Sequence, residues 1–297
     1  MTNFPKEFLW GAATSSYQIE GAANEDGRGA SIWDTFCKTP GKVANGDTGD
    51  VANDHYHRYP EDIKIMKELG LQGYRFSFAW PRMFPNGDDV REERGFDFYD
   101  RLIDGLLEAG IEPLATLYHW DLPQALQDKG GWVNRDIINH FADYSTAVAQ
   151  RFGDRVKKFS PINEPWVVAW LGYGIGIHAP GILDRRSAFA AAHHTVLTHA
   201  ASTNAMRAVR SDILTGPVLN QTNYIGRINV LDGRLPDTNL NAAHEFPMTI
   251  GIGQQSLTNN LNTSLSGYPK SIKLVLSKVQ NKNFKLNIKS LKFTVLR

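Results

Sequence analysis

The sequence contains one cysteine, Cys37, so no disulfide can form within the chain. A reducing compartment is the simpler expectation for such a composition. No run approaches about 18 consecutive apolar residues, so we expect no membrane-spanning helix. The N-terminus, Met1–Pro5, has no basic stretch followed by an apolar run, and we therefore expect no signal peptide. These absences together predict a cytoplasmic protein.

Acidic residues are missing from the last part of the chain. From Phe246 to Arg297 there are seven Lys, one Arg and no Asp or Glu, although the formal net charge of the whole chain is only +1. The rest of the chain is therefore net acidic. The lysines alternate with Asn, Ser and Leu instead of clustering, so we expect neither a nucleic acid nor a membrane as a partner. We predict a domain over residues 1–245 and an irregular basic tail over 246–297.

Strand-like and helix-like segments alternate along the first 220 residues. The predicted strands are Phe8–Thr14, Gly73–Trp80, Ile111–Tyr118, Lys158–Ile162 and Leu214–Leu219. The predicted helices are Asp62–Leu69, Phe96–Ala109, Arg135–Phe152 and Ser187–Arg210. This order predicts an α/β fold in which helical crossovers join parallel strands. No glycine-rich phosphate motif follows the first strand, which disfavours a nucleotide-binding sheet.

Polar and aromatic side chains follow the predicted strands at their carboxyl ends. They are Gln18, Glu20, Arg75, Trp80, His119, Trp120, Asp121, Asn163 and Glu164. Functional groups at successive strand ends are typical of a barrel whose loops form one pocket. Glu164 directly follows Asn163. A Glu at this position can act as a general acid/base, and in a glycosidase it would be one of the two catalytic carboxylates. Taken alone, Gln18 and His119 could equally be structural polar groups, and Arg75 half of a buried ion pair.

Longer motifs surround these residues. Phe8–Gly21 (FLWGAATSSYQIEG), Tyr74–Arg82 (YRFSFAWPR), Thr116–Pro123 (TLYHWDLP) and Ile162–Pro165 (INEP) resemble motifs of glycoside hydrolase family 1, the β-glucosidase family, in the same order. The resemblance extends from Phe4 to about Tyr224. It implies a (β/α)8 TIM barrel that hydrolyses β-glycosides or oligosaccharides with retention, without a metal or organic cofactor.

The resemblance also implies roles for individual residues. Glu164 would be the acid/base, and Arg75 would hold the nucleophilic carboxylate. Gln18, His119, Trp120 and Asn163 would bind the terminal sugar. Amide and imidazole groups suit sugar hydroxyls because they can both donate and accept hydrogen bonds. Family relatives that cleave thioglucosides carry Gln at the position of Glu164, so an O-glycosidase is favoured. The choice among glucoside, galactoside and fucoside stays open, as does the oligomeric state.

The sequence departs from the family pattern in its last part. The family nucleophile is a Glu in a Thr-Glu-Asn-Gly segment on the seventh strand, and no such segment is present; Glu245 does not resemble it. Five strand candidates end at Leu219, whereas eight units of this spacing need roughly 400 residues. We therefore expect an incomplete barrel of about five strands, truncated or frame-disrupted after about residue 225–245, without a nucleophile. A genuine interaction tail is the alternative.

Two functions remain on this basis. The first is a β-glycosidase by descent that is inactive or weakly active as this chain. The second is a non-catalytic, sugar-binding barrel fragment or one part of a complemented enzyme. Without a neighbouring nucleophile and in an open pocket, we expect Glu164 to have the pKa of an ordinary Glu, about 4.3.

Overall fold

The computed structural model describes residues 5, 8–88 and 90–220. The chain divides into two units, Met1–Asn220 and Gln221–Arg297. The predicted domain boundary at residue 245 and the predicted basic tail lie outside the described residues, as does Glu245.

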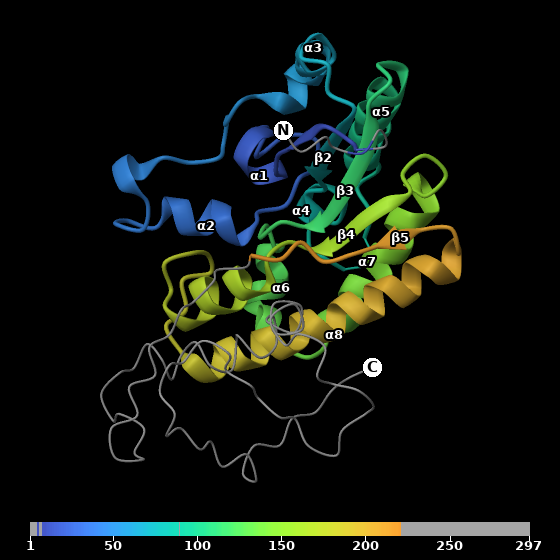
Figure 1. The fold of residues 1–297 in the computed structure, drawn as a ribbon. Coiled ribbons are helices and arrows are strands. Elements are labelled where there is room, and N and C mark those ends of the chain that lie inside the picture. The colour runs from blue at the N-terminus through green and yellow to red at the C-terminus, as the bar shows by residue number, and fades with distance from the viewer. Residues whose placement is uncertain (1–4, 6–7, 89, 221–297) are drawn as a thin grey trace, which may run out of the picture. The chain divides into compact units, whose positions relative to one another are not determined.

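The first unit is built on a sheet of parallel strands in chain order (Figure 1). The strands are β1 (Gly11–Ala13), β2 (Gly73–Ser77), β3 (Glu112–Tyr118), β4 (Lys158–Ile162) and β5 (Leu214–Thr215). Each strand pairs with its neighbour in the sequence, for example Ala13 beside Arg75 and Thr116 beside Ser160. Parallel neighbours need a crossover connection, and helices supply it. The predicted α/β fold with five parallel strands is therefore confirmed.

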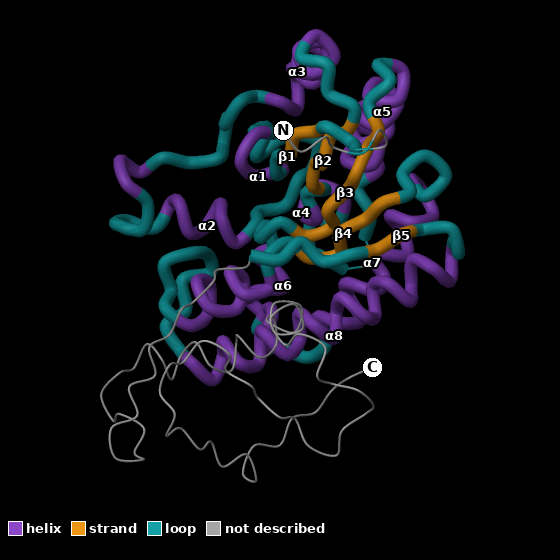
Figure 2. The backbone as a smooth tube through the Cα atoms, in the orientation of Figure 1, coloured by secondary structure: helices purple, strands orange, loops and turns teal. Residues whose placement is uncertain are grey.

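The connecting segments are mostly helical, and Figure 2 shows the strands side by side with these helices around them. The α-helices are α1 (Ser16–Ile19), α2 (Ile32–Lys38), α3 (His55–Glu68), α4 (Trp80–Met83), α5 (Glu93–Glu108), α6 (Gln124–Asp128), α7 (Ile137–Phe152) and α8 (Arg185–Val209). The short helical turns are η1 (Ala44–Gly46), η2 (Gly131–Val133) and the π-helix η3 (Val167–Gly174).

Several predicted boundaries were wrong. β1 is Gly11–Ala13 instead of Phe8–Thr14, and β5 is Leu214–Thr215 instead of Leu214–Leu219. Helix α3 begins at His55, seven residues before the predicted Asp62, although Pro60 lies inside it. Tertiary contacts hold that first part, because the N–H of Tyr56 donates to the carbonyl oxygen of Glu20 at 3.0 Å and its hydroxyl donates to Asp26 Oδ2 at 2.6 Å. The predicted strand Gly73–Trp80 ends at Ser77, because Trp80 begins the one-turn helix α4.

Aromatic side chains fill the core between the sheet and helices α5 and α7. The rings of Trp80 and Tyr144 stack at 4.9 Å, and Phe78 stacks on Phe152 at 5.0 Å. All four side chains are almost completely buried. Trp80, predicted at a strand end where it could face the pocket, is therefore part of the core. In the described part of the chain, no helix is long and apolar enough to cross a membrane.

A buried ion pair joins the segment after β1 to helix α4. Arg82 Nε donates to Glu20 Oε2 at 3.0 Å, and the two side chains are 0% and 5% exposed. The hydroxyl of Tyr99 donates to the other Glu20 oxygen at 2.6 Å. Glu20 therefore holds elements together inside the protein and does not face the pocket. Because both charges are removed from water, each depends on the other for compensation.

We predict that Glu20→Gln destabilises the fold by about 3–5 kcal/mol, since it leaves the Arg82 guanidinium buried without a counter-charge. The control is Glu61→Gln, which removes the carboxylate from the exposed Arg58–Glu61 pair on α3. That change should cost less than about 1 kcal/mol. Urea unfolding followed by circular dichroism measures both, and equal losses would contradict the role given to the buried pair.

Candidate active site

The candidate site lies at the carboxyl ends of β2, β3 and β4, where Arg75, His119 and Asn163 meet. Arg75 Nη1 donates to Asn163 Oδ1 at 3.0 Å, and it also lies 3.4 Å from Thr116 Oγ1. Asn163 Nδ2 lies 3.1 Å from His119 Nε2. One hydrogen-bonded chain therefore runs from Arg75 through Asn163 to His119. Three of the predicted site residues, from three strands, are brought together in this way.

The hydrogen bonds fix the orientation of the Asn163 amide and the tautomer of His119. Since the Asn163 oxygen accepts from Arg75, its NH2 group faces His119 and Nε2 must accept. The imidazole proton then lies on Nδ1, which is buried and has no hydrogen-bond partner among the described residues. Burial, with a smaller effect of the Arg75 charge, lowers the pKa of His119 to about 4. The imidazole is therefore neutral at pH 7.

Glu164 follows Asn163 in an unusual backbone conformation. Its φ is +50°, and its N–H donates to the carbonyl oxygen of Val218 at 2.8 Å. Left-handed conformations of residues other than glycine cost free energy and often occur at functional sites. Trp120, directly after His119, also has a positive φ of +78°, and its Nε1 donates to the carbonyl oxygen of Asn163 at 3.1 Å.

The prediction that Glu164 has the pKa of an ordinary Glu was wrong, because its pKa is raised. Burial raises the pKa of the Glu164 carboxyl above its usual value, and the positive charge of Arg75 only partly opposes that shift. Burial also lowers the pKa of Arg75, while the Glu164 charge raises it. The Glu164 carboxyl is partly shielded from water, and the effect of this partial burial on its pKa exceeds the opposing effect of the Arg75 charge.

Gln18 occupies a different position from the other predicted residues. It lies on α1, is exposed, and its Oε1 accepts a hydrogen bond from Ser15 Oγ at 2.7 Å. The contacts of the described residues thus connect Gln18 to its own turn and not to Arg75, His119 or Asn163. Its predicted role in sugar binding stays a prediction.

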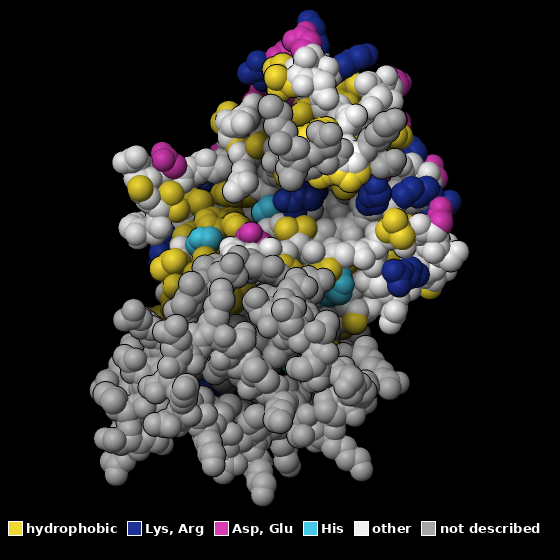
Figure 3. Space-filling view, in the orientation of Figure 1, with side chains coloured by type: hydrophobic (Ala, Val, Ile, Leu, Met, Phe, Trp, Pro, Cys, Tyr) yellow, Lys and Arg dark blue, Asp and Glu magenta, His cyan; other side chains and the backbone are white. Residues whose placement is uncertain are grey.

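The sequence analysis missed Trp33 and His178. The His178 ring lies 5.4 Å from the Trp120 ring and 5.5 Å from the Trp33 ring. Trp33 comes from α2, and His178 from the loop between η3 and α8. Neither residue ends a predicted strand, so strand-end position could not reveal them. Figure 3 shows a hollowed face on which basic, acidic and His side chains gather among hydrophobic ones.

Asp121 was noted only as a polar residue at a strand end, and the structure places it in the interior, next to Ser16. It is fully buried, and its Oδ2 accepts from Ser16 Oγ at 2.6 Å. Ser16 in turn is bonded to Ser77, through its N–H at 2.7 Å and its hydroxyl at 3.0 Å. This network ties together the segments that follow β1, β2 and β3. Burial, reinforced by the Glu20 charge and opposed by hydrogen bonds and Arg28, raises the pKa of Asp121 to about 7.

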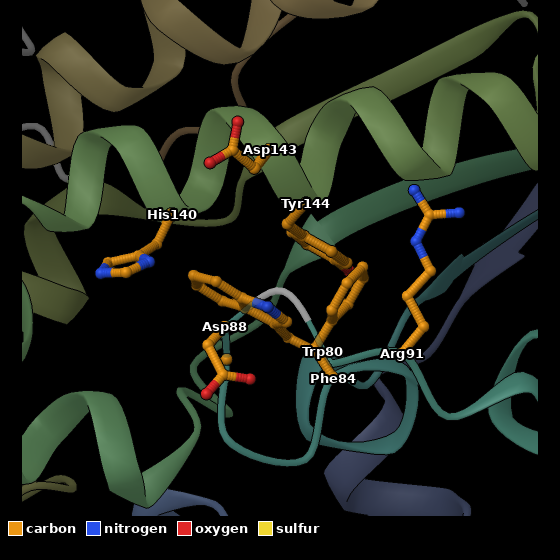
Figure 4. Close-up of a pocket in the computed structure, with 8 residues that line it drawn as sticks. Trp80, Phe84, Asp88, Arg91, His140, Asp143 and Tyr144 are labelled. Atoms are coloured by element: carbon orange, nitrogen blue, oxygen red, sulfur yellow. The ribbon is translucent and has the colours of Figure 1, made fainter.

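A further hollow lies elsewhere, between α4, the loop after it and α7. Figure 4 shows Asp88, Arg91, His140 and Asp143 around the aromatic side chains of this hollow. It shares no residue with the candidate site. Among the described residues, no group of three or more His, Cys, Asp or Glu side chains is placed to hold a metal ion.

Comparisons with known proteins agree in pointing to one family. The model of glycosyl hydrolase family 1 matches residues 1–231. β-Glucosidase A of Acetivibrio thermocellus is 55% identical over 217 residues, which cover 73% of this chain and 48% of the relative. β-Glucosidase A of Thermotoga maritima is 54% identical over 217 residues, 73% of this chain and 49% of the relative.

Solved structures give the same result. The family 1 β-glucosidase of Thermotoga maritima is similar at a TM-score of 0.74 and 53% identity, over 74% of this chain and 51% of that one. Further structures of the Thermotoga protein contain noeuromycin or deoxynojirimycin. This chain spans about half the length of the curated relatives it matches.

We predict that Asp121 makes the fold less stable as the pH rises. Its folded-state pKa is about 7 instead of the usual 3.8, so the folded protein keeps a proton that the unfolded chain releases. Stability therefore falls between about pH 4 and pH 7, by up to about 4 kcal/mol. Asp121→Asn cannot ionise and should lack this fall. Urea unfolding across that pH range measures it, with exposed Asp136→Asn as the control; parallel profiles for all three proteins would contradict the assignment.

Proposed function

Because the chain belongs to glycosyl hydrolase family 1, its five parallel strands are part of a TIM barrel of that family, and we propose that they form the sugar-binding and proton-donating part of a β-glucosidase. The observation that carries the proposal is the Arg75–Asn163–His119 hydrogen-bond chain beside Glu164. It places a neutral imidazole, an amide and a carboxyl together at the carboxyl ends of neighbouring strands, where TIM barrels carry their active sites.

The sugar would be bound by groups that the structure leaves oriented for it. The neutral His119 imidazole and the Asn163 amide would bind sugar hydroxyls, because such groups can both donate and accept hydrogen bonds. Asn163 holds the imidazole in this tautomer and is itself fixed by Arg75. The rings of Trp120, His178 and Trp33 supply apolar surface next to these donors. The Thermotoga structures with noeuromycin and deoxynojirimycin support a ligand of monosaccharide size.

Glu164 would act as the general acid and then as the general base. The raised pKa keeps the carboxyl protonated to a higher pH, so its proton can pass to the leaving oxygen as the glycosidic C–O bond breaks. The resulting carboxylate can then take a proton from the water that attacks the sugar. Retention requires a second carboxylate about 5–5.5 Å away. In the described part of the chain, Arg75 is the charged group that affects the pKa of Glu164, and no carboxylate does so.

We therefore propose that the 297-residue chain binds a glucose-like ligand but hydrolyses β-glucosides poorly by itself. Binding depends on groups that the described strands supply. Hydrolysis also depends on a nucleophile for which neither the sequence motifs nor the described residues offer a candidate.

For binding, we predict that Asn163→Ala weakens deoxynojirimycin affinity by at least about tenfold, because it releases both Arg75 and His119 from their orienting hydrogen bonds. Isothermal titration calorimetry measures the affinity, and circular dichroism checks that the variant is folded. The control, Asn139→Ala, changes an exposed residue of α7 and should bind like the parent chain. No binding by the parent chain, or equal binding by both variants, would rule out the proposed sugar site.

For hydrolysis, we expect the kcat/KM of the chain toward a nitrophenyl β-glucoside to be at least about a thousandfold below that of Thermotoga maritima β-glucosidase A under the same conditions. Loss of one member of a catalytic pair typically has an effect of this size or larger. Turnover comparable to the relative, abolished by Glu164→Gln, would reveal a second working carboxylate and refute the proposed lack of one.

A further inference from the structure

A buried carboxyl connects Gln18, which follows β1, to the segment His119–Trp120, which follows β3. Ser16 is the first residue of α1, the one-turn helix that also carries Gln18. The Ser16 hydroxyl donates to Asp121 Oδ2 at 2.6 Å, and Asp121 comes directly after Trp120 in the sequence. This hydrogen bond therefore ties the turn that carries one predicted sugar-binding residue to the segment that carries two others.

Ser77, the last residue of β2, fixes the direction of this hydrogen bond. The N–H of Ser16 donates to Ser77 Oγ at 2.7 Å, and the Ser77 hydroxyl in turn donates to Ser16 Oγ at 3.0 Å. Since Ser16 Oγ already accepts one proton, its own proton is free to be donated, and Asp121 is the acceptor. All three side chains are at most 2% exposed, so water does not compete for these bonds.

The backbone between His119 and Asp121 is held on both sides. Trp120 has a φ of +78°, a conformation that costs free energy in a residue other than glycine and persists only where the surroundings impose it. On one side, Trp120 Nε1 donates to the carbonyl oxygen of Asn163 at 3.1 Å. On the other side, the next side chain, Asp121, is bonded to Ser16. Loss of the Asp121 carboxyl would therefore release α1 and remove one of the contacts that hold Trp120.

Other contacts hold the far end of α1 without involving Asp121. The N–H of Asn53 donates to the carbonyl oxygen of Ile19 at 3.2 Å. The N–H of Tyr56 donates to the carbonyl oxygen of Glu20 at 3.0 Å. Removal of the Asp121 carboxyl should therefore let the start of α1 move while the segment as a whole stays in the fold.

The Asp121 carboxyl is also an unfavourable group to keep in the interior. Its Oδ1 is buried and has no hydrogen-bond partner among the described residues. Burial raises the pKa of Asp121 to about 7, and the charge of Arg28 opposes that rise only in part. A group that weakens the fold and is joined to site residues is expected to serve the site, because such groups are concentrated at functional sites.

We propose that Asp121 is a positioning residue for sugar binding: through Ser16 it holds α1 so that Gln18 meets the same sugar as His119 and Trp120. The proposal rests on the proposed function, because these three residues share a ligand only if a sugar binds at the strand ends. It goes further because it assigns to the site a residue whose effect on binding acts through Gln18.

The test is a mutant cycle in which isothermal titration calorimetry measures the affinity for deoxynojirimycin. Asp121→Ala removes the acceptor of Ser16 and should weaken binding at least about tenfold. That loss should vanish when Gln18 is already Ala, since the two changes then act on one contact. Asp121→Asn still offers an oxygen to Ser16 and should bind within about threefold of the parent chain. The matched control, Asp184→Ala, removes a Ser–Asp hydrogen bond of 2.7 Å, from Ser187, at the exposed start of α8 and should bind like the parent.

A purely structural role for Asp121 predicts a different pattern. Asp121→Ala would then weaken binding by the same factor with and without Gln18, and that result overturns the proposal. An Asp121→Asn variant that binds as poorly as Asp121→Ala overturns it too, as does an equal loss in Asp184→Ala. Circular dichroism checks that each variant is folded. If Asp121→Ala does not fold, Ser16→Ala takes its place in the cycle, because it removes the same hydrogen bond from the other side.

Hydrogen exchange without ligand separates this proposal from the proposed function. If the parent chain does not bind deoxynojirimycin, the proposed sugar site fails, and backbone amide exchange then decides whether Asp121 positions α1. Faster exchange in Asp121→Ala, confined to α1 and residues 119–121, supports that positioning. Unchanged exchange in α1, or faster exchange throughout the sheet, overturns it.

Discussion

The hydrogen bond from Arg75 to the side-chain oxygen of Asn163 is the interaction on which the candidate site depends. A guanidinium can only donate, so the Asn163 amide has one possible orientation, and through it His119 has one tautomer. The charge of Arg75 also acts on both neighbours: it helps to keep His119 neutral and moderates the upward pKa shift of Glu164. Burial is the main cause of both pKa shifts, and the charge of Arg75 adds to its effect at His119 and opposes it at Glu164.

A second hydrogen-bond network, separate from the Arg75–Asn163–His119 chain, also connects the strand ends. The Asp121–Ser16–Ser77 network joins the segments that lie at the ends of β1, β2 and β3. Buried polar groups that are hydrogen-bonded to one another favour one arrangement, although Asp121 Oδ1 has no hydrogen-bond partner among the described residues. The chain segments at the strand ends are thus held together by buried polar groups as well as by the sheet.

Much of the fold could be predicted from the sequence because its strands and long helices are locally encoded. Strand Lys158–Ile162 agrees with its prediction at both ends, and α5, α7 and α8 agree within three residues. The start of α3 and the π-helix η3 could not be predicted, since contacts distant in sequence stabilise the first and the second departs from regular periodicity. For the site, strand-end position revealed Arg75, His119, Asn163 and Glu164. It could not reveal His178 in a loop, or the burial that raises the pKa of Glu164.

The order of the strands has a consequence for how such a chain forms. Each strand in the described sheet pairs with the strand made just before it, and no pairing waits for a segment synthesised much later. Sheets with this topology can assemble from the N-terminus as the chain leaves the ribosome. The Arg75–Asn163–His119 chain would be complete once β4 has been added to β3. A family 1 barrel could therefore possess its sugar-binding geometry on the ribosome well before it can close.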